Sequence, residues 1–191
     1  SIRMTRSVHS RFAGPLVALF TAVFCLAGCT PEATYLCPDD TQCLMITEIA
    51  AAGTELLDED GSVEDWIEIY NVHDRAIPVG GYHLTDTEGA TGWRMPERVL
   101  QPGEFLVVFL SRKSRRGETL HTDFALNADG EYLGLVRPSG LVESSFETFP
   151  EQQFGISYGR AFRDGAPTEE LRFFPSPTPG AANGTGSSDI D

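Results

Sequence analysis

Basic residues are scarce in this sequence. Lys and Arg together number 14, against 28 Asp and Glu, so the chain of 191 residues has a formal net charge of −14. Binding to nucleic acid depends on clustered Lys and Arg that neutralise phosphates. We therefore expect no nucleic-acid partner, and the acidity suits a surface that faces water.

The sequence also lacks an apolar run long enough for a membrane-spanning helix. The stretch from Phe12 to Ala27 contains no charged residue, but at roughly 15 residues it is shorter than the about 20 that a helix needs to cross the hydrocarbon core. It follows Arg3, Arg6 and Arg11, an order typical of an export signal. The segment therefore predicts export rather than a helical anchor.

The residues Leu26-Ala27-Gly28-Cys29 end this apolar stretch and resemble a bacterial lipobox. The resemblance implies cleavage of a signal peptide over residues 1–28 and a mature N-terminus at Cys29, whose thiol carries diacylglycerol. An ordinary secretory signal or a short membrane anchor is the alternative. Because Thr30 rather than Asp follows the cysteine, we expect attachment to the outer membrane, facing the periplasm or the cell surface.

Cysteine is scarce as well. Of the four cysteines, Cys25 lies in the signal and Cys29 would carry the lipid, which leaves Cys37 and Cys43 as a pair in an oxidising setting. We predict a disulfide between them that closes a small loop and contributes about 2 kcal/mol. Zinc is the competing use, but structural zinc needs four ligands and the histidines after the signal are widely scattered.

No segment shows a long helical period. Short runs rich in aromatic and β-branched residues alternate instead with turns such as Asp60-Gly61 and Gly80-Gly81. The predicted strands are 44–50, 66–71, 82–85, 92–95, 105–110, 131–136, 141–146 and 154–159. The pattern predicts an all-β chain folded as an antiparallel sandwich.

Several short motifs follow one another in a fixed order through these strands. They are Ile46-Thr47-Glu48-Ile49, Asp65-Trp66-Ile67-Glu68-Ile69-Tyr70-Asn71, Gly81-Tyr82-His83-Leu84-Thr85-Asp86, Pro102-Gly103-Glu104-Phe105-Leu106-Val107-Val108, His121-Thr122-Asp123-Phe124-Ala125-Leu126, Gly130-Glu131-Tyr132-Leu133-Gly134-Leu135, Ser157-Tyr158-Gly159-Arg160 and Thr178-Pro179-Gly180-Ala181-Ala182-Asn183. Together they resemble a lamin tail domain, an immunoglobulin-like antiparallel β-sandwich. The resemblance implies a non-catalytic module for interaction or tethering, and no rod segment is present to imply a nuclear role.

The resemblance covers about 44–183 and sets the predicted organisation of the chain. A signal peptide (1–28) precedes a lipid-anchored linker with the possible disulfide (29–43), the sandwich domain (44–183) and a tail (184–191). The tail is rich in Gly, Ser and Asp and has nothing to pack, so we expect it to be disordered.

An acidic loop between two predicted strands contains Asp58, Asp60, Glu64 and Asp65. Its spacing does not fit an EF-hand, because apolar residues fall at the first and twelfth ligand positions. Clustered carboxylates can still take up Ca²⁺ at the millimolar concentrations found outside cells, which makes a calcium-dependent adhesion or glycan-binding module the alternative function. A solvated hairpin loop with an Asp-Gly turn is the simpler interpretation.

The single basic cluster consists of Arg112, Lys113, Arg115 and Arg116. On a loop, these side chains would suit the phosphates of lipopolysaccharide or anionic lipid, or an acidic partner, because Arg binds such groups in a bidentate manner. The simpler interpretation is a loop kept soluble by its charge, which also limits edge pairing of the strand before it.

The segment Gly155-Ile156-Ser157-Tyr158-Gly159 satisfies the G-x-S-x-G pattern of a hydrolase nucleophile elbow. No helical pattern follows it, and every histidine precedes Ser157, whereas that fold places its histidine last. We therefore interpret the segment as a strand and the protein as no enzyme, and a hydrolase that uses Ser157 is the remaining alternative. The predicted function is a lipid-anchored interaction or scaffolding module with a membrane attachment at Cys29 and an envelope protein or glycan as partner.

Overall fold

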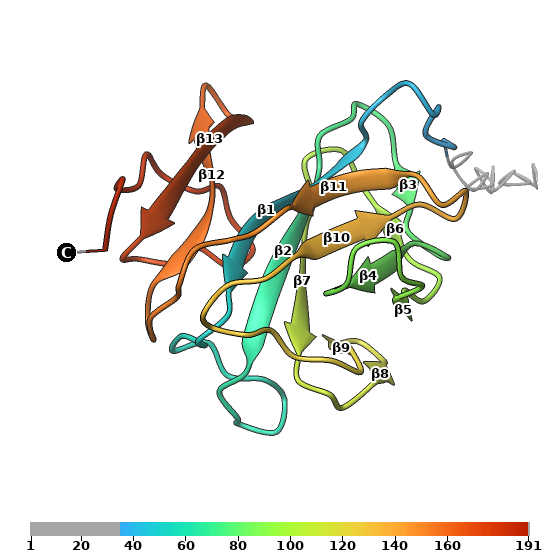
Figure 1. Cartoon of the computed structure of the whole chain (residues 1–191). Helices are drawn as coiled ribbons and strands as arrows, with labels where there is room; N and C mark the ends of the chain where they lie inside the picture. The colour runs from blue at the N-terminus through green and yellow to red at the C-terminus, as the bar shows by residue number, and fades with distance from the viewer. Residues whose placement is uncertain (1–34, 191) are drawn as a thin grey trace, which may run out of the picture. The chain divides into compact units, whose positions relative to one another are not determined.

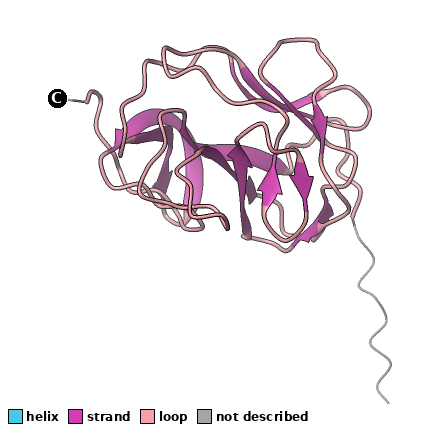
Figure 2. Ribbon diagram, turned by 90° about the horizontal axis from the view of Figure 1, so that it is seen from below, coloured by secondary structure: helices cyan, strands magenta, loops and turns pink. Residues whose placement is uncertain are grey.

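The fold comes from a computed structural model that describes residues 35–190. The predicted signal peptide and Cys29 lie outside these residues. Within them the secondary structure consists of strands, turns and loops, without a helix (Figure 2). No helix of the described part is long and apolar enough to cross a membrane.

Thirteen strands make up three sheets (Figure 1). They are β1 (Leu44–Ala50), β2 (Asp65–Asn71), β3 (Ile77–Pro78), β4 (His83–Thr85), β5 (Trp93–Arg94), β6 (Val99–Leu100), β7 (Phe105–Leu110), β8 (Arg115–Arg116), β9 (Leu120–His121), β10 (Leu133–Val136), β11 (Val142–Phe146), β12 (Ser157–Arg163) and β13 (Ala166–Phe174). The large sheet has the order β13-β12-β1-β2-β7-β9-β8, and the second has the order β11-β10-β4-β5. A two-stranded sheet pairs β3 with β6.

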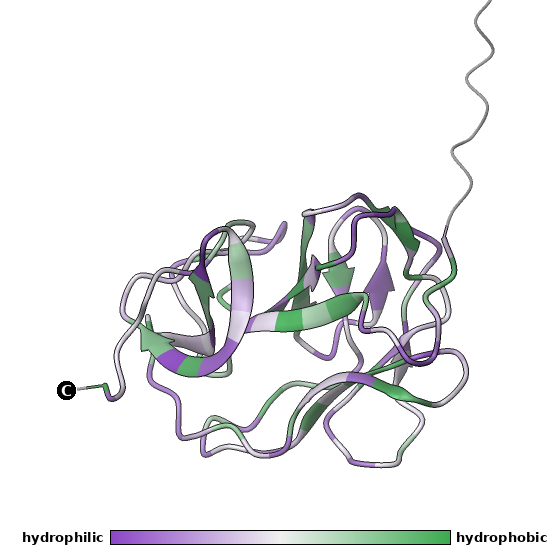
Figure 3. Cartoon of the chain, turned by 90° about the horizontal axis from the view of Figure 1, so that it is seen from above, coloured by the Kyte–Doolittle hydropathy of each residue, from purple (hydrophilic) through white to green (hydrophobic). Residues whose placement is uncertain are grey.

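Strand pairing is antiparallel except between β7 and β9, which run parallel. The predicted all-β antiparallel sandwich is thus confirmed. Aliphatic side chains of β1, β2 and β7 pack against β4, β10 and β11 in the main core, which includes Ile46, Ile67, Val108 and Leu135. Figure 3 shows apolar stretches in green along several strands.

The other face of β1 and β2 is buried too. Trp66 packs there with Ala50 and Phe109 in a second, smaller cluster. Because side chains alternate between the two faces of a strand, Glu68 shares the face of Trp66 and points away from the main core. This face of the large sheet is the one that the chain's last segments cover.

Strand β13 was not predicted. Its sequence from Ala166 to Phe174 carries two glutamates and an arginine, and polar and apolar residues do not alternate cleanly along it. It is an edge strand with one exposed side, where Pro167 costs no hydrogen bond of the sheet. Asp164 and Gly165 form the hairpin turn before it with positive φ angles of 51° and 80°, the conformation that such two-residue turns require.

The expected disorder of residues 184–191 is not what the structure shows for 184–190. Ser187 exchanges two backbone hydrogen bonds with Phe173, at 2.7 and 2.8 Å. Gly186 permits this approach, since a Cβ on it would lie 2.5 Å from the Cβ of Arg172. The tail has few apolar side chains to pack, but its backbone can still form hydrogen bonds with an open edge strand. This pairing orders the tail.

Candidate functional site

The two charged loops that the sequence singles out meet in the structure. Lys113, in the loop after β7, places its Nζ 3.0 Å from Oδ2 of Asp60 and 3.1 Å from Oε1 of Glu64, both in the loop before β2. It also forms an ion pair with Asp58, whose side chain is fully buried. Three of the four predicted calcium ligands therefore surround an ammonium group of the same chain.

This contact decides the electrostatics of the acidic loop. Burial alone would raise the pKa of Asp58, but hydrogen bonds from Lys113 and from the backbone N–H groups of Ser62 and Asp60 outweigh it and lower the pKa. The same carboxylates raise the pKa of Lys113. Since the ammonium already sits between these oxygens, the residues do not fit a Ca²⁺ ion in addition.

A second row of contacts continues from the same loop. Arg115 places Nη1 2.7 Å from Oε1 of Glu59 and 2.8 Å from Oδ2 of Asp60. The other oxygen of Glu59 lies 2.8 Å from Nε2 of His121. Hydrogen bonds from His121 and Arg115 lower the pKa of Glu59 to about 2, so this carboxylate is ionised at neutral pH.

His121 links the loops through both of its ring nitrogens. It lies on β9, is 0% exposed and stacks on Phe109 at 5.3 Å between ring centroids. Because the Glu59 carboxylate only accepts hydrogen bonds, we assign the proton to Nε2. Nδ1 then lies 2.7 Å from Oγ of Ser111, whose hydroxyl donates to it.

The chain of Ser111, His121 and Glu59 has the residue types of a hydrolase triad, and sequence reasoning did not single it out. A triad histidine must hand its proton to a leaving group, whereas this imidazole is fully enclosed. Asp58, Glu59 and His121 also bring ligand atoms within 4.8 Å of one another, but Lys113, Arg115 and the mutual histidine–glutamate bond engage them. The network thus holds two loops together.

Asp65, the fourth predicted calcium ligand, points elsewhere. Its Oδ2 accepts a hydrogen bond from the backbone N–H of Leu126 at 3.1 Å. Burial raises its pKa to about 7, and the nearby charge of Glu64 adds to this rise. Together with Ser111 and Arg112 it lines a small hollow of about 180 Å³.

The four predicted anion contacts have different environments. Lys113 and Arg115 are engaged in the ion pairs above. The guanidinium of Arg116 lies 4.8 Å from the ring centroid of Trp93, and its Nε donates to the carbonyl of Arg94. Arg112 is exposed, on backbone with a positive φ of 63°. The cluster therefore supports the fold at three of its four positions.

Two buried carboxylates form a second polar site on the large sheet. Glu48 on β1 and Glu68 on β2 are paired across the strands, and both are fully buried. Glu48 accepts the backbone N–H of Thr178 at 3.1 Å, and Glu68 accepts that of Gly180 at 2.7 Å. The C-terminal segment 175–183, which we call the strap, is therefore bound to the sheet by these two side chains.

Burial raises the pKa of both glutamates. For Glu68 the pKa rises to about 8, because desolvation and the charge of Glu48 outweigh the hydrogen bond from Thr47. For Glu48 burial also dominates over the hydrogen bonds from Ser157 and Thr178. The motifs quoted for the family resemblance contain both glutamates, but sequence reasoning assigned them no role. The sequence feature that points to their role is an acidic residue within an otherwise apolar strand.

Ser157 belongs to this buried site and not to a nucleophile elbow. It is the first residue of β12, is fully buried and donates its hydroxyl to Glu48. The chain after it stays extended to Arg163 instead of turning into a helix. The predicted strand 154–159 is therefore confirmed only from Ser157 onward, because Phe154 and Gly155 lie in a turn and β12 begins at Ser157.

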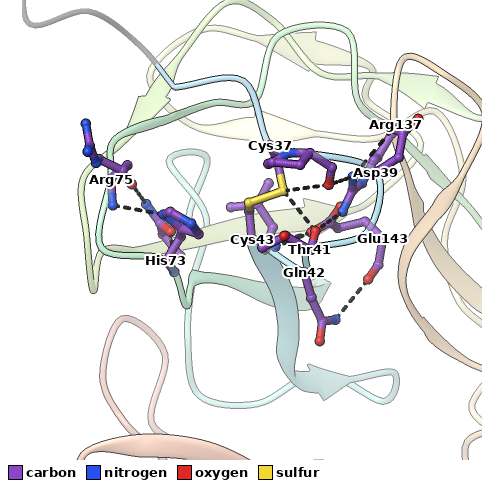
Figure 4. The surroundings of a disulfide bond; sticks show 12 residues. Cys37, Asp39, Thr41, Gln42, Cys43, His73, Arg75, Arg137 and Glu143 are labelled. Carbon is purple, nitrogen blue, oxygen red and sulfur yellow. Dashed lines mark hydrogen bonds and ion pairs between the residues drawn. A yellow bond between two sulfur atoms is a disulfide. The ribbon is translucent and has the colours of Figure 1, made fainter.

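A disulfide and several hydrogen bonds attach residues 37–43 to the rest of the domain (Figure 4). Cys37 and Cys43 are joined by a disulfide with 6.0 Å between their Cα atoms. Arg137, paired with the buried Glu143, donates to the carbonyl of Pro38 at 2.7 Å. The backbone N–H of Cys43 donates to Glu143 at 2.7 Å.

These contacts move the predicted boundary between linker and domain. Residues 37–43 were assigned to the linker, whereas the disulfide and the Arg137–Glu143 pair attach them to the sandwich. Partners about 100 residues away in the sequence make this attachment, so local composition did not indicate it.

The family model of the Lamin Tail Domain matches residues 38–148, which is more than half of the chain. No curated protein matches. The matched range begins inside the disulfide loop and includes both charged loops, β1 and β2.

Proposed function

This chain belongs to the lamin tail domain family, and from that premise we propose that it is a lipid-anchored, non-catalytic interaction module of a bacterial cell envelope. Family membership supports an immunoglobulin-like module without catalytic function. The charged loops support it as well, because Lys113 and Arg115 are engaged by acidic side chains of the same chain. The partner is an envelope protein or a glycan.

The proposed lipid anchor is inferred from the position of Cys29. It ends an apolar stretch with Leu26-Ala27-Gly28 before it, the order that lipoprotein processing requires. Cys37, eight residues later, already belongs to the fixed part of the domain. A processed lipoprotein cysteine carries several acyl chains, and more than one chain is needed for stable attachment.

Membrane fractionation of cells that express the full chain tests the anchor. The native protein should sediment with membranes, and Cys29→Ser should appear in the soluble or secreted fraction. Cys25→Ser is the matched control, because it removes a cysteine from the same apolar stretch outside the lipobox. Equal sedimentation of all three proteins would contradict the proposal.

A further inference from the structure

Large apolar side chains are exposed at the end of the domain where the described residues begin. We call this the tether end, because the predicted lipid-anchored linker precedes it in the sequence. Leu36 is 80% exposed, Leu141 44% and Val142 54%. Leu36 directly precedes the disulfide loop, Leu141 ends the turn between β10 and β11, and Val142 is the first residue of β11. Figure 1 shows this turn beside the first described residues. Exposure of several large apolar groups at one place marks an interaction site more often than scattered ones do.

The exposed side chains stand on fixed backbone. In the β10–β11 turn the N–H of Arg137 donates to the carbonyl of Leu141 at 2.8 Å, and that of Gly140 donates back to Arg137 at 2.9 Å. Gly140 has a positive φ of 91°, which only glycine adopts readily. The guanidinium of Arg137 then ties this turn to Pro38. The disulfide loop that follows Leu36 and the turn that ends at Leu141 are therefore held together.

Two hollows that share Pro138 connect Leu36 with Val142, the neighbour of Leu141 in the sequence. One shallow hollow of about 190 Å³ is lined by Leu36 and Pro138, and a second of about 270 Å³ is lined by Pro138 and Val142. Pro138 lies in both and is itself exposed. We call Leu36, Pro138, Leu141 and Val142 the tether-end surface.

We propose that the tether-end surface rests in the lipid bilayer that holds the acylated Cys29. The inference depends on the proposed anchor. Only seven peptide steps separate Cys29 from Leu36, so that the surface lies within at most about 25 Å of the lipid even on a fully extended chain. Tethering at such a distance keeps the effective concentration of the bilayer in the millimolar range, where a weak apolar contact is occupied.

The charges beside the surface favour apolar insertion over electrostatic attraction. Among the residues that line the two hollows, Arg137 is buried and paired with Glu143, while Asp39 is exposed. An anionic lipid surface gains nothing from an exposed carboxylate. Contact with the bilayer should therefore persist at high salt.

Quenching by brominated phospholipids tests the proposal on the full lipidated chain in phosphatidylethanolamine–phosphatidylglycerol vesicles. The native Trp66 and Trp93 are buried, so Leu141→Trp adds the one exposed reporter in the described domain. We expect its emission to shift to the blue and to lose most of its intensity with bromine in the acyl chains. Leu57→Trp is the matched control, because this exposed leucine lies in the loop at the far end of β1.

A second pair of variants tests whether the surface acts as a unit. With Leu36→Trp as the reporter, replacing both Leu141 and Val142 by Ser should abolish quenching while the protein still sediments with vesicles. Replacing Leu57 and Val63 by Ser should leave quenching intact. If the protein sediments with vesicles but neither reporter is quenched, the proposed bilayer contact of the tether-end surface is wrong and the proposed lipid anchor is retained. If the protein does not sediment, both proposals are wrong. Cross-linking between copies without quenching would assign the surface to self-association and overturn the proposal.

Discussion

At the residue scale, single ionisable side chains determine what the charged loops are. Lys113 takes the place that a metal ion would have among Asp58, Asp60 and Glu64. An ammonium group on a side chain needs no external ligand, whereas a calcium site of this kind would be filled only outside the cell. The acidic loop is therefore a closed ion-pair network.

Removal of the ammonium should convert this network into a calcium site. In Lys113→Met the carboxylates lose their cation, so we expect a lower Tm without calcium and a Tm that rises with millimolar Ca²⁺. Arg112→Met, at the exposed neighbour, is the control and should gain no calcium response. Thermal melting with and without chelator measures the difference, and a native protein that responds to Ca²⁺ as strongly as Lys113→Met would contradict this interpretation.

Glu68 should make the stability of the domain depend on pH. Its pKa is raised to about 8 in the folded protein from 4.5, so the folded state binds the proton more tightly than the unfolded one. The contribution of protonated Glu68 to the free energy of unfolding is fully present below about pH 4.5. It is lost as pH rises towards 8, and the free energy of unfolding then falls by up to about 1.4 kcal/mol per pH unit. Glu48 faces the same site and shifts in the same direction.

The variant Glu68→Gln separates this effect from other titrations. The amide imitates the protonated acid, since its nitrogen can donate to Thr47 while its oxygen accepts from Gly180. We expect a flatter dependence of the free energy of unfolding on pH between 5 and 8, and greater stability than the native protein at pH 8. Urea unfolding at several pH values measures this. A variant with the native pH slope would contradict the assignment.

At the element scale, the strap is the least expected feature. Residues 175–183 cover the face of β1 and β2 that lies away from the main core. Asn183 completes this attachment, because its Nδ2 donates to the carbonyls of Thr47 and Arg160 at 2.9 Å each, and its Oδ1 accepts the hydroxyl of Thr178 at 2.7 Å. One buried amide thus joins β1, β12 and the strap.

Replacement of Asn183 by Ala should weaken the strap strongly. It removes two hydrogen bonds to backbone carbonyls and one from the Thr178 hydroxyl, all within a buried site, and we expect a loss of about 2 to 3 kcal/mol in the free energy of unfolding. Asn127→Ala is the control, because Asn127 is exposed and its side chain makes only a local turn contact. Urea unfolding of both variants gives the comparison, and equal losses would contradict the role of Asn183.

The elements that the sequence predicted best are those whose burial alternates or is complete. The strand 105–110 was predicted with its exact bounds, because an apolar run follows a Pro-Gly turn. Strand β13 and the pairing of Ser187 were missed, since edge strands need no apolar face. The two charged loops were each recognised, but their contact joins residues more than 50 positions apart and has no local signature.

At the scale of the whole molecule, the disulfide loop and the β10–β11 turn lie together at one end of the sandwich, where Arg137 joins them. The 51–64 loop follows β1, whose seven residues span about 20 Å from the tether end. The ion-pair network of Lys113 is therefore held away from the disulfide loop. The strongly acidic composition keeps the remaining surface in water.

The mass of the intact protein from a membrane fraction tests the central claim most directly. The account predicts that the mature chain begins at Cys29 and carries the added mass of a diacylglycerol and its acyl chains. One disulfide, between Cys37 and Cys43, should account for the remaining cysteines. A chain that begins at another residue, or that carries Cys29 as a free thiol, would contradict the anchor.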